Sequence, residues 1–117
     1  METTAFGREG ETLARAYLEK KGMRFIERNF RRTHGEIDLI MKDGEFLVFV
    51  EVKTRRSLRW GLPIEAVTPL KQRRIRDCAA LYYAERHVSG CPARFDIVEI
   101  LALPGKELKI RHLANAF

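Results

Sequence analysis

The feature that most constrains the fold is a pair of strand-like segments at residues 36–41 and 45–54, separated by Asp43-Gly44. Both segments are rich in β-branched and aromatic residues, and Asp-Gly predicts a tight hairpin turn because both residues tolerate positive φ. Residues 46–50 are apolar at every position, which is typical of a strand covered on both faces. We therefore expect a sheet flanked by helices.

The rest of the chain supplies further strands and two helices. Helical spacing of apolar residues predicts a first helix over residues 3–22, ended by Gly22, and a second helix begins at Thr68-Pro69 and runs to about residue 87. The core stripe of the second helix is Ile75, Cys78, Ala79 and Tyr82. Further strands are predicted at residues 24–30, 93–101 and 108–113, and residues 58–67 are predicted to form a loop. The expected fold is α/β, with a mixed central sheet and the order α-β-β-β-α-β-β.

Length and composition favour one soluble domain. The chain has 117 residues, and 45% of them are hydrophobic, which suits a single core over residues 1–117. The longest apolar run covers residues 78–84, far short of the roughly 20 residues of a membrane-spanning helix. We expect a cytoplasmic protein that has no membrane partner. Cys78 and Cys91 do not form a C-x-x-C pair and the three histidines are scattered, so we expect packing roles for the thiols and no zinc site.

Basic residues are concentrated in one part of the chain. Residues 53–76 contain eight lysines and arginines and one acid, a net charge of +7, although the whole chain carries only +6. Such a cluster is typical of a protein that binds a polyanion, and the alternative is a solvated surface. The residues that we expect to contact nucleic acid are Arg55, Arg56, Arg59, Lys71, Arg73 and Arg74.

Acidic residues are placed together on the predicted hairpin. Residues two apart in a strand share a face, so Glu36 lies with Asp38, and Glu51 lies with Lys53. A two-residue turn at Asp43-Gly44 would set Glu36 opposite Glu51 and Asp38 opposite Phe49. Asp38 and Glu51 are then diagonal neighbours, with backbones about 7–8 Å apart.

Three acids on one face of such a strand repel one another and require compensation. A hard divalent cation, Mg²⁺ or Mn²⁺, is the natural partner for carboxylate oxygens and also binds substrate phosphate. Beside such a cation, Lys53 would orient or deprotonate the attacking water and stabilise charge on the phosphate. The alternative is that Glu51 and Lys53 form an ordinary exposed pair at the end of a strand.

The order of these residues resembles that of known nucleases. Asp38 followed by Glu51-Val52-Lys53 resembles the D…E-x-K core of the restriction-endonuclease-like nuclease superfamily. Further motifs resemble the YraN family of small bacterial proteins over nearly the whole chain. They are Gly10-Glu11 with Ala14 and Tyr17-Leu18, Arg28-Asn29, GEIDLI at 35–40, VFVEVK at 48–53, Gly61 with Pro63, Glu65-Ala66-Val67, Lys71 and Arg94-Phe95-Asp96.

This resemblance implies a nuclease-like α/β fold related to archaeal Holliday-junction resolvases. It implies that Glu11 corresponds to the helix acid of those enzymes, so that Glu11 joins Asp38 and Glu51 as a metal ligand. An exposed helix acid is the alternative for Glu11. Glu36 belongs to the GEID motif of the YraN family and is a further catalytic candidate. The resolvases are dimers, which implies a homodimer here.

The expected function is that of a metal-dependent endonuclease that hydrolyses phosphodiester bonds in DNA, including branched or junction DNA. The catalytic candidates are Asp38, Glu51, Lys53, Glu36 and Glu11. One alternative is a nucleic-acid-binding module that keeps the nuclease-like fold without turnover. Another is an adaptor whose basic segment docks an acidic protein. Only the first function requires the acids and Lys53 to converge, because the other two need the basic segment alone.

Overall fold

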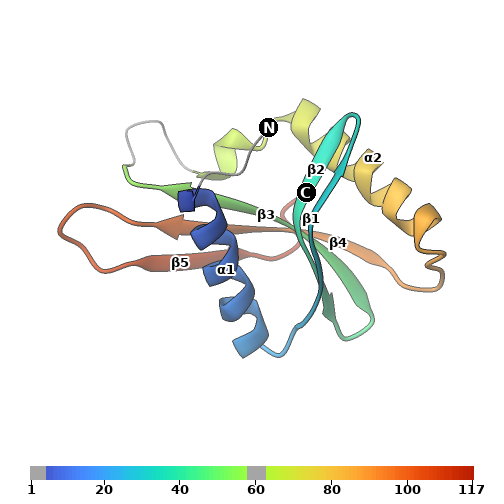
Figure 1. The fold of residues 1–117 in the computed structure, drawn as a ribbon, viewed down its shortest axis with the longest axis horizontal. Helices are drawn as coiled ribbons and strands as arrows, with labels where there is room; N and C mark the ends of the chain where they lie inside the picture. Colours follow the sequence, from blue (N-terminus) through green and yellow to red (C-terminus); the bar gives the residue numbers. More distant parts are fainter. Residues whose placement is uncertain (1–4, 58–62) are drawn as a thin grey trace.

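The computed structural model describes residues 5–57 and 63–117. Its elements are α1 Ala5–Lys20, β1 Arg24–Arg32, β2 Gly35–Asp43, β3 Phe46–Arg55, the short 3-10 helix η1 Pro63–Ala66, α2 Pro69–Glu85, β4 Ala93–Leu101 and β5 Lys109–Leu113 (Figure 1). The predicted order α-β-β-β-α-β-β is confirmed. Within the described ranges, no helix is long and apolar enough to cross a membrane.

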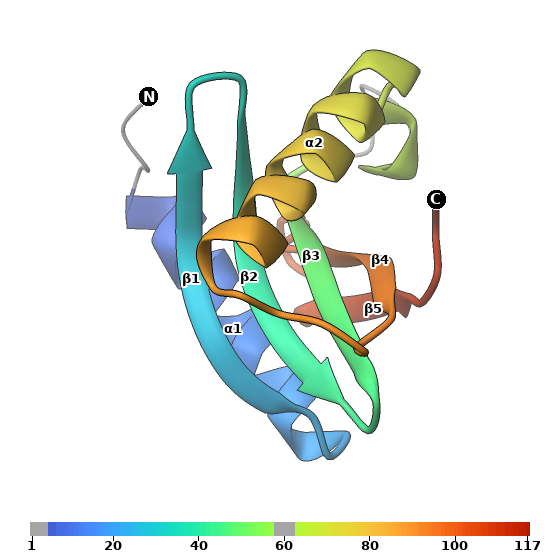
Figure 2. The ribbon, with the colours of Figure 1, turned by 90° about the vertical axis from the view of Figure 1, so that its right-hand side faces the viewer.

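The strands form one mixed sheet in the order β1-β2-β3-β4-β5. The pairs β1/β2, β2/β3 and β4/β5 are antiparallel, whereas β3 and β4 are parallel and are connected through η1 and α2. The two long helices cover opposite faces of this sheet, with α2 in front and α1 behind in Figure 2. The predicted mixed sheet flanked by helices is therefore confirmed, and it explains why residues 47–50 of β3 are all buried.

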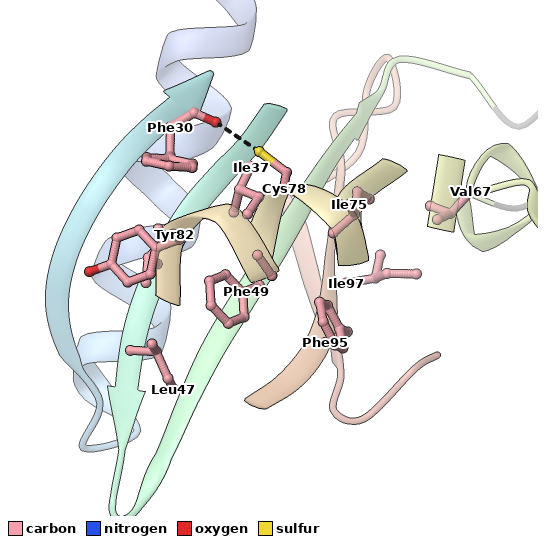
Figure 3. Close-up of a cluster of buried hydrophobic side chains, with 12 residues drawn as sticks. Phe30, Ile37, Leu47, Phe49, Val67, Ile75, Cys78, Tyr82, Phe95 and Ile97 are labelled. Atoms are coloured by element: carbon pink, nitrogen blue, oxygen red, sulfur yellow. Dashed lines mark hydrogen bonds between the residues drawn. The ribbon is translucent and has the colours of Figure 1, made fainter. Parts of the chain in front are cut away.

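Each face of the sheet carries its own hydrophobic core. Under α2, the predicted stripe of Ile75, Cys78, Ala79 and Tyr82 is buried against the sheet (Figure 3). The Tyr82 ring meets the ring of Phe30 edge to face at 5.2 Å between centroids. The Cys78 thiol points to the Phe30 carbonyl oxygen at 3.8 Å, so its predicted role as a packing residue is confirmed.

The hairpin register differs from the prediction by two residues. Asp43 pairs with Phe46, so the turn residues are Gly44 and Glu45 and not Asp43 and Gly44. Of these two, only Gly44 has positive φ, at +59°. This is the pattern of a type II′ turn, in which glycine is the first of the two central residues. Asp43 stays in β2 because its carboxylate accepts a hydrogen bond from Arg94 of β4 at 2.9 Å.

This register moves the predicted partners. Phe49 lies opposite Ile40, and Val50 lies opposite Leu39. The predicted pairing of Asp38 with Phe49, and that of Glu36 with Glu51, are both wrong. Glu51 follows Val50, and Asp38 precedes Leu39. The observed register therefore places Glu51 beside Asp38.

Candidate active site

Asp38 lies where β2 separates from β3. The ladder between the two strands ends at Leu39 and Val50, and the amide of Val52, two residues further along β3, donates to Asp38 Oδ2 at 2.8 Å. Ile37 packs into the core under α2, whereas Leu39 packs into the core under α1. Residues 37 and 39 thus face opposite sides, and the normal alternation of a strand breaks at Asp38. The break turns the carboxyl group of Asp38 towards the end of β3.

Asp38 and Glu51 form a hydrogen-bonded pair of carboxyl groups. Burial, together with the hydrogen bond and charge of Glu51, raises the pKa of Asp38 well above its ordinary value. Burial opposes ionisation of Glu51 as well, but the hydrogen bond from Asp38 and the charge of Lys71 hold the pKa of Glu51 below its ordinary value. In the metal-free pair, the carboxyl group of Asp38 is therefore the harder of the two to ionise.

Two lysines stand beside this pair. Lys71 of α2 places its Nζ 2.9 Å from Glu51 Oε2, and Lys53 of β3 lies beside Lys71. Burial and the neighbouring Lys71 lower the pKa of Lys53. Burial also opposes the charge of Lys71, but the attraction of Glu51 raises its pKa overall. The structure thus brings Lys71, which we predicted only as a nucleic-acid contact, into the acidic site itself.

Glu11 reaches the site from α1 because that helix packs very closely on β3. Gly10 faces Thr54, and a Cβ atom added to Gly10 would lie 2.3 Å from Thr54 Oγ1. The adjacent Glu11 is only 5% exposed. Its carboxylate oxygens, together with those of Glu36 and Asp38, offer ligand atoms that all lie within 4.8 Å of one another. Three sequence candidates from α1 and β2 thus meet, and Asp38 links them to Glu51.

A second group of side chains surrounds these acids from β1. Arg28 donates to Glu11 at 3.2 Å, and Arg31 forms an ion pair with Glu36 at 3.1 Å. The Asn29 amide lies between the two carboxylates and donates to both. Sequence reasoning assigned no site role to these β1 residues. The available signal was the Arg28-Asn29 pair among the YraN-like motifs, but that pair alone does not reveal its partners.

The acids and lysines line one open cleft of about 840 Å³ between α1, the β1–β2 hairpin and the start of α2. Arg55 at the end of β3 and Arg74 of α2 also line the cleft. Arg73 is exposed on α2 outside it, and Arg56 directly follows β3. Arg59 lies outside the described residues. The described members of the basic segment thus divide into residues inside the cleft and residues on neighbouring surfaces.

Comparison with known proteins assigns the chain to a family. The sequence profile of the uncharacterised protein family UPF0102 matches residues 10–100. The chain belongs to UPF0102. A UPF0102 protein of Symbiobacterium thermophilum is 50% identical over 95% of this chain and 94% of its own length. A UPF0102 protein of Rhodococcus opacus is 49% identical over 97% of this chain and 96% of its own length.

The UPF0102 assignment confirms the YraN resemblance inferred from the motifs. The matched region contains all four acids of the site and both of its lysines. The names of the UPF0102 relatives state no activity. Membership of UPF0102 therefore assigns no chemistry to the chain by itself.

The donor set fits a hard divalent cation. All the converging ligand atoms of Glu11, Glu36 and Asp38 are carboxylate oxygens, which Mg²⁺ and Mn²⁺ prefer over softer nitrogen and sulfur donors. Mg²⁺ is commonly held by one or two carboxylates and retains several waters, so the open cleft leaves room for the waters and for a substrate phosphate. Among the described residues, the predicted metal ligand Glu51 is not part of this converging set: it lies beside Asp38 and pairs with Lys71, whereas Glu36 takes the third position.

Proposed function

We propose that this protein is a metal-dependent endonuclease that hydrolyses phosphodiester bonds in DNA. The observation that carries the proposal is the convergence of acids from α1, β2 and β3, and of lysines from β3 and α2, in one cleft with further arginines on its wall. Repulsion between neighbouring carboxylates makes such an arrangement costly for a purely structural purpose. A cation together with an anionic substrate would compensate that cost.

Each side chain has a definite role in this proposal. Glu11, Glu36 and Asp38 would hold Mg²⁺ or Mn²⁺, and Glu51 would complete the set from β3. The cation supplies Lewis acidity and lowers the pKa of a bound water. Lys53, which lines the cleft beside Glu51 and Lys71, would hold the attacking water or the non-bridging oxygens of the phosphate. A cation binds the ionised carboxylate of Asp38, and the raised pKa of Asp38 opposes its ionisation, so cation binding should be tighter at higher pH.

The substrate would follow the basic wall of the cleft. Arg55 and Arg74 line it, so phosphates that pass them approach the acids and Lys53. Arginine contacts to phosphate position a nucleic acid without reading its sequence. We therefore propose that the protein recognises DNA by shape, and that branched DNA, including four-way junctions, is a substrate to be tested first.

The direct test is incubation with linear, single-stranded and four-way-junction DNA in the presence of Mg²⁺, Mn²⁺ or a chelator. We expect cleavage with either cation and none with chelator. Asp38→Asn should abolish it. Asp77→Asn is the matched control, because Asp77 is exposed on α2 outside the cleft, and this variant should cleave like the wild type.

The same experiment separates the proposal from its main alternative. A protein that binds these DNAs with metal and chelator alike, but cleaves none of them, would be a nucleic-acid-binding module without turnover. Equal cleavage by the wild type and Asp38→Asn would contradict the catalytic assignment and point to a contaminating nuclease.

A further inference from the structure

Asn29 has a backbone conformation that is rare inside a β-strand. Its φ is +53°, in the left-handed region that L residues disfavour and that asparagine tolerates better than most. On either side of it, Arg28 pairs with Leu39, and Phe30 pairs with Ile37, so the position across from Asn29 is Asp38. The regular ladder is thus interrupted opposite the very residue at which β2 leaves β3. Unusual backbone conformations of this kind persist where the surroundings hold them, and they cluster at functional sites.

The side chain of Asn29 connects two elements that are far apart in sequence. Its Nδ2 lies 3.1 Å from Glu11 Oε1 and 3.3 Å from Glu11 Oε2, and it lies 3.4 Å from Glu36 Oε1. Glu11 comes from α1, whereas Glu36 comes from β2. One amide group on the edge strand therefore holds both carboxylates close together, against their mutual repulsion.

The chemistry of this contact differs from that of the neighbouring arginines. Arg28 and Arg31 also contact Glu11 and Glu36, but each of them does so with a full positive charge and a partly exposed side chain. A neutral amide donates hydrogen bonds to carboxylates and leaves their net negative charge in place. It can therefore fix the two carboxylates without competing electrostatically with a cation.

We propose that Asn29 is a positioning residue that sets the distance between Glu11 and Glu36 and so preorganises them to bind a divalent cation. This inference rests on the cation site of the proposed function. Groups that hydrogen-bond to metal ligands and orient them typically change metal affinity by about 10–100-fold when they are mutated. Removal of the Asn29 amide should weaken Mn²⁺ binding by a factor in that range.

Asn29→Gly is the informative variant. Glycine accepts positive φ without a steric penalty, so the substitution removes the amide and leaves the backbone conformation accessible. Asn115→Gly is the matched control, because Asn115 is also left-handed, with φ of +52°, and lies after β5 outside the cleft. Both variants and the wild type would be titrated with Mn²⁺ by calorimetry, with melting temperature and circular dichroism recorded for each.

The inference predicts about 10-fold or greater loss of Mn²⁺ affinity in Asn29→Gly and wild-type affinity in Asn115→Gly. A folded Asn29→Gly protein that binds Mn²⁺ as tightly as the wild type would overturn it. A structural role alone would lower the melting temperature of Asn29→Gly without changing the Mn²⁺ affinity of the folded protein.

A double-mutant cycle identifies the route by which Asn29 acts. If the amide works through Glu36, its loss should cost much less Mn²⁺ affinity in a Glu36→Gln background than in the wild type, and fully additive effects would contradict that route.

The Mn²⁺ titrations of the wild type and of Asn29→Gly also separate this inference from the proposed function. A wild-type protein that binds no Mn²⁺ removes the cation site altogether, whereas wild-type binding that Asn29→Gly leaves unchanged removes only the role of Asn29.

Discussion

Gly10 should control the cation site although its own atoms offer no ligand. It is buried where α1 crosses the end of β3, and a Cβ added there would lie 2.3 Å from Thr54 Oγ1, whereas ordinary contacts begin at 3.4 Å. Gly10→Ala therefore requires α1 or Thr54 to move by about 1 Å, because packed interiors have little free space. Glu11 is the next residue on α1, so displacement of the helix carries its carboxylate away from Glu36 and Asp38.

The effect on stability is the difference of two opposing contributions. Overpacking of a well-packed interior costs about 1–3 kcal/mol, whereas alanine in place of glycine within a helix gains about 1 kcal/mol. We expect the free energy of unfolding to fall by roughly 0–2 kcal/mol, which lowers the melting temperature by at most about 8 °C at about 4 °C per kcal/mol. The protein should therefore fold, so that its ligand binding can be measured.

The same substitution should also weaken the binding of a cation at the site. Coordination of Mg²⁺ has strict distances near 2.0–2.1 Å, and a carboxylate displaced by about 1 Å no longer meets them. We expect Gly10→Ala to weaken Mn²⁺ binding by about 10-fold or more, in line with the effect of disturbing groups that orient metal ligands. Calorimetric titration and thermal melting of the same samples measure the two effects separately.

A second substitution tests the cause. Thr54→Ala removes the Oγ1 atom that the new methyl group would meet, so the double variant Gly10→Ala, Thr54→Ala should recover most of the Mn²⁺ affinity. Wild-type affinity in Gly10→Ala alone, or no recovery in the double variant, would refute the idea that close packing of α1 on β3 positions Glu11.

Three further predictions concern the acids, the lysine and the arginines. Asp38→Asn should raise the melting temperature of the metal-free protein at pH values where Asp38 is ionised, because the ionised carboxylates of Asp38 and Glu51 repel each other. The pKa of Asp38 is raised above its ordinary 3.8, so native stability falls as pH rises from about that value through the raised pKa, and the advantage of the variant should grow over the same window. An advantage that is independent of pH in thermal melts would contradict this. Lys53→Ala should lower turnover far more than DNA affinity, because Lys53 is proposed to act at the reacting phosphate. Equal losses of rate in single-turnover kinetics and of affinity in binding assays would make Lys53 an ordinary contact to the DNA phosphate backbone. Arg55→Ala and Arg74→Ala should each reduce the logarithmic salt slope of DNA binding by about one unit, and weaker binding with an unchanged slope in fluorescence titrations at several salt concentrations would place the DNA elsewhere.

Much of the fold was predictable because local signals agreed with one another. The apolar run of residues 46–50 required cover on both faces, and Thr68-Pro69 marked the start of α2, where the Thr68 hydroxyl accepts from the amide of Lys71. The stripe of α2 followed from helical periodicity and is buried as predicted. Each of these signals comes from residues that are close together in the sequence, so the sequence pattern alone reveals it.

The hairpin register was not predictable from the turn sequence. Asp43-Gly44 suits a type I′ turn, but the ion pair of Asp43 with Arg94, some 50 residues later, keeps Asp43 in the strand. A shift of two residues preserves the face of every side chain while it changes every partner. Asp38 and Glu51 were therefore correctly predicted to be neighbours, although the predicted diagonal placement was wrong.

By itself, the sequence determined the α/β class, the order of the elements, the two-sided cover of β3 and the set of chemically capable residues, because all of these depend on local pattern and residue type. Tertiary structure alone decided which of those residues meet. Glu11 joins the acids only because Gly10 lets α1 approach β3, and Lys71 joins Glu51 only because α2 crosses back over the sheet. Asn29 gains its role only where β1 passes both carboxylates. Contacts of this kind depend on packing between distant elements, and no local pattern in the chain encodes their distances.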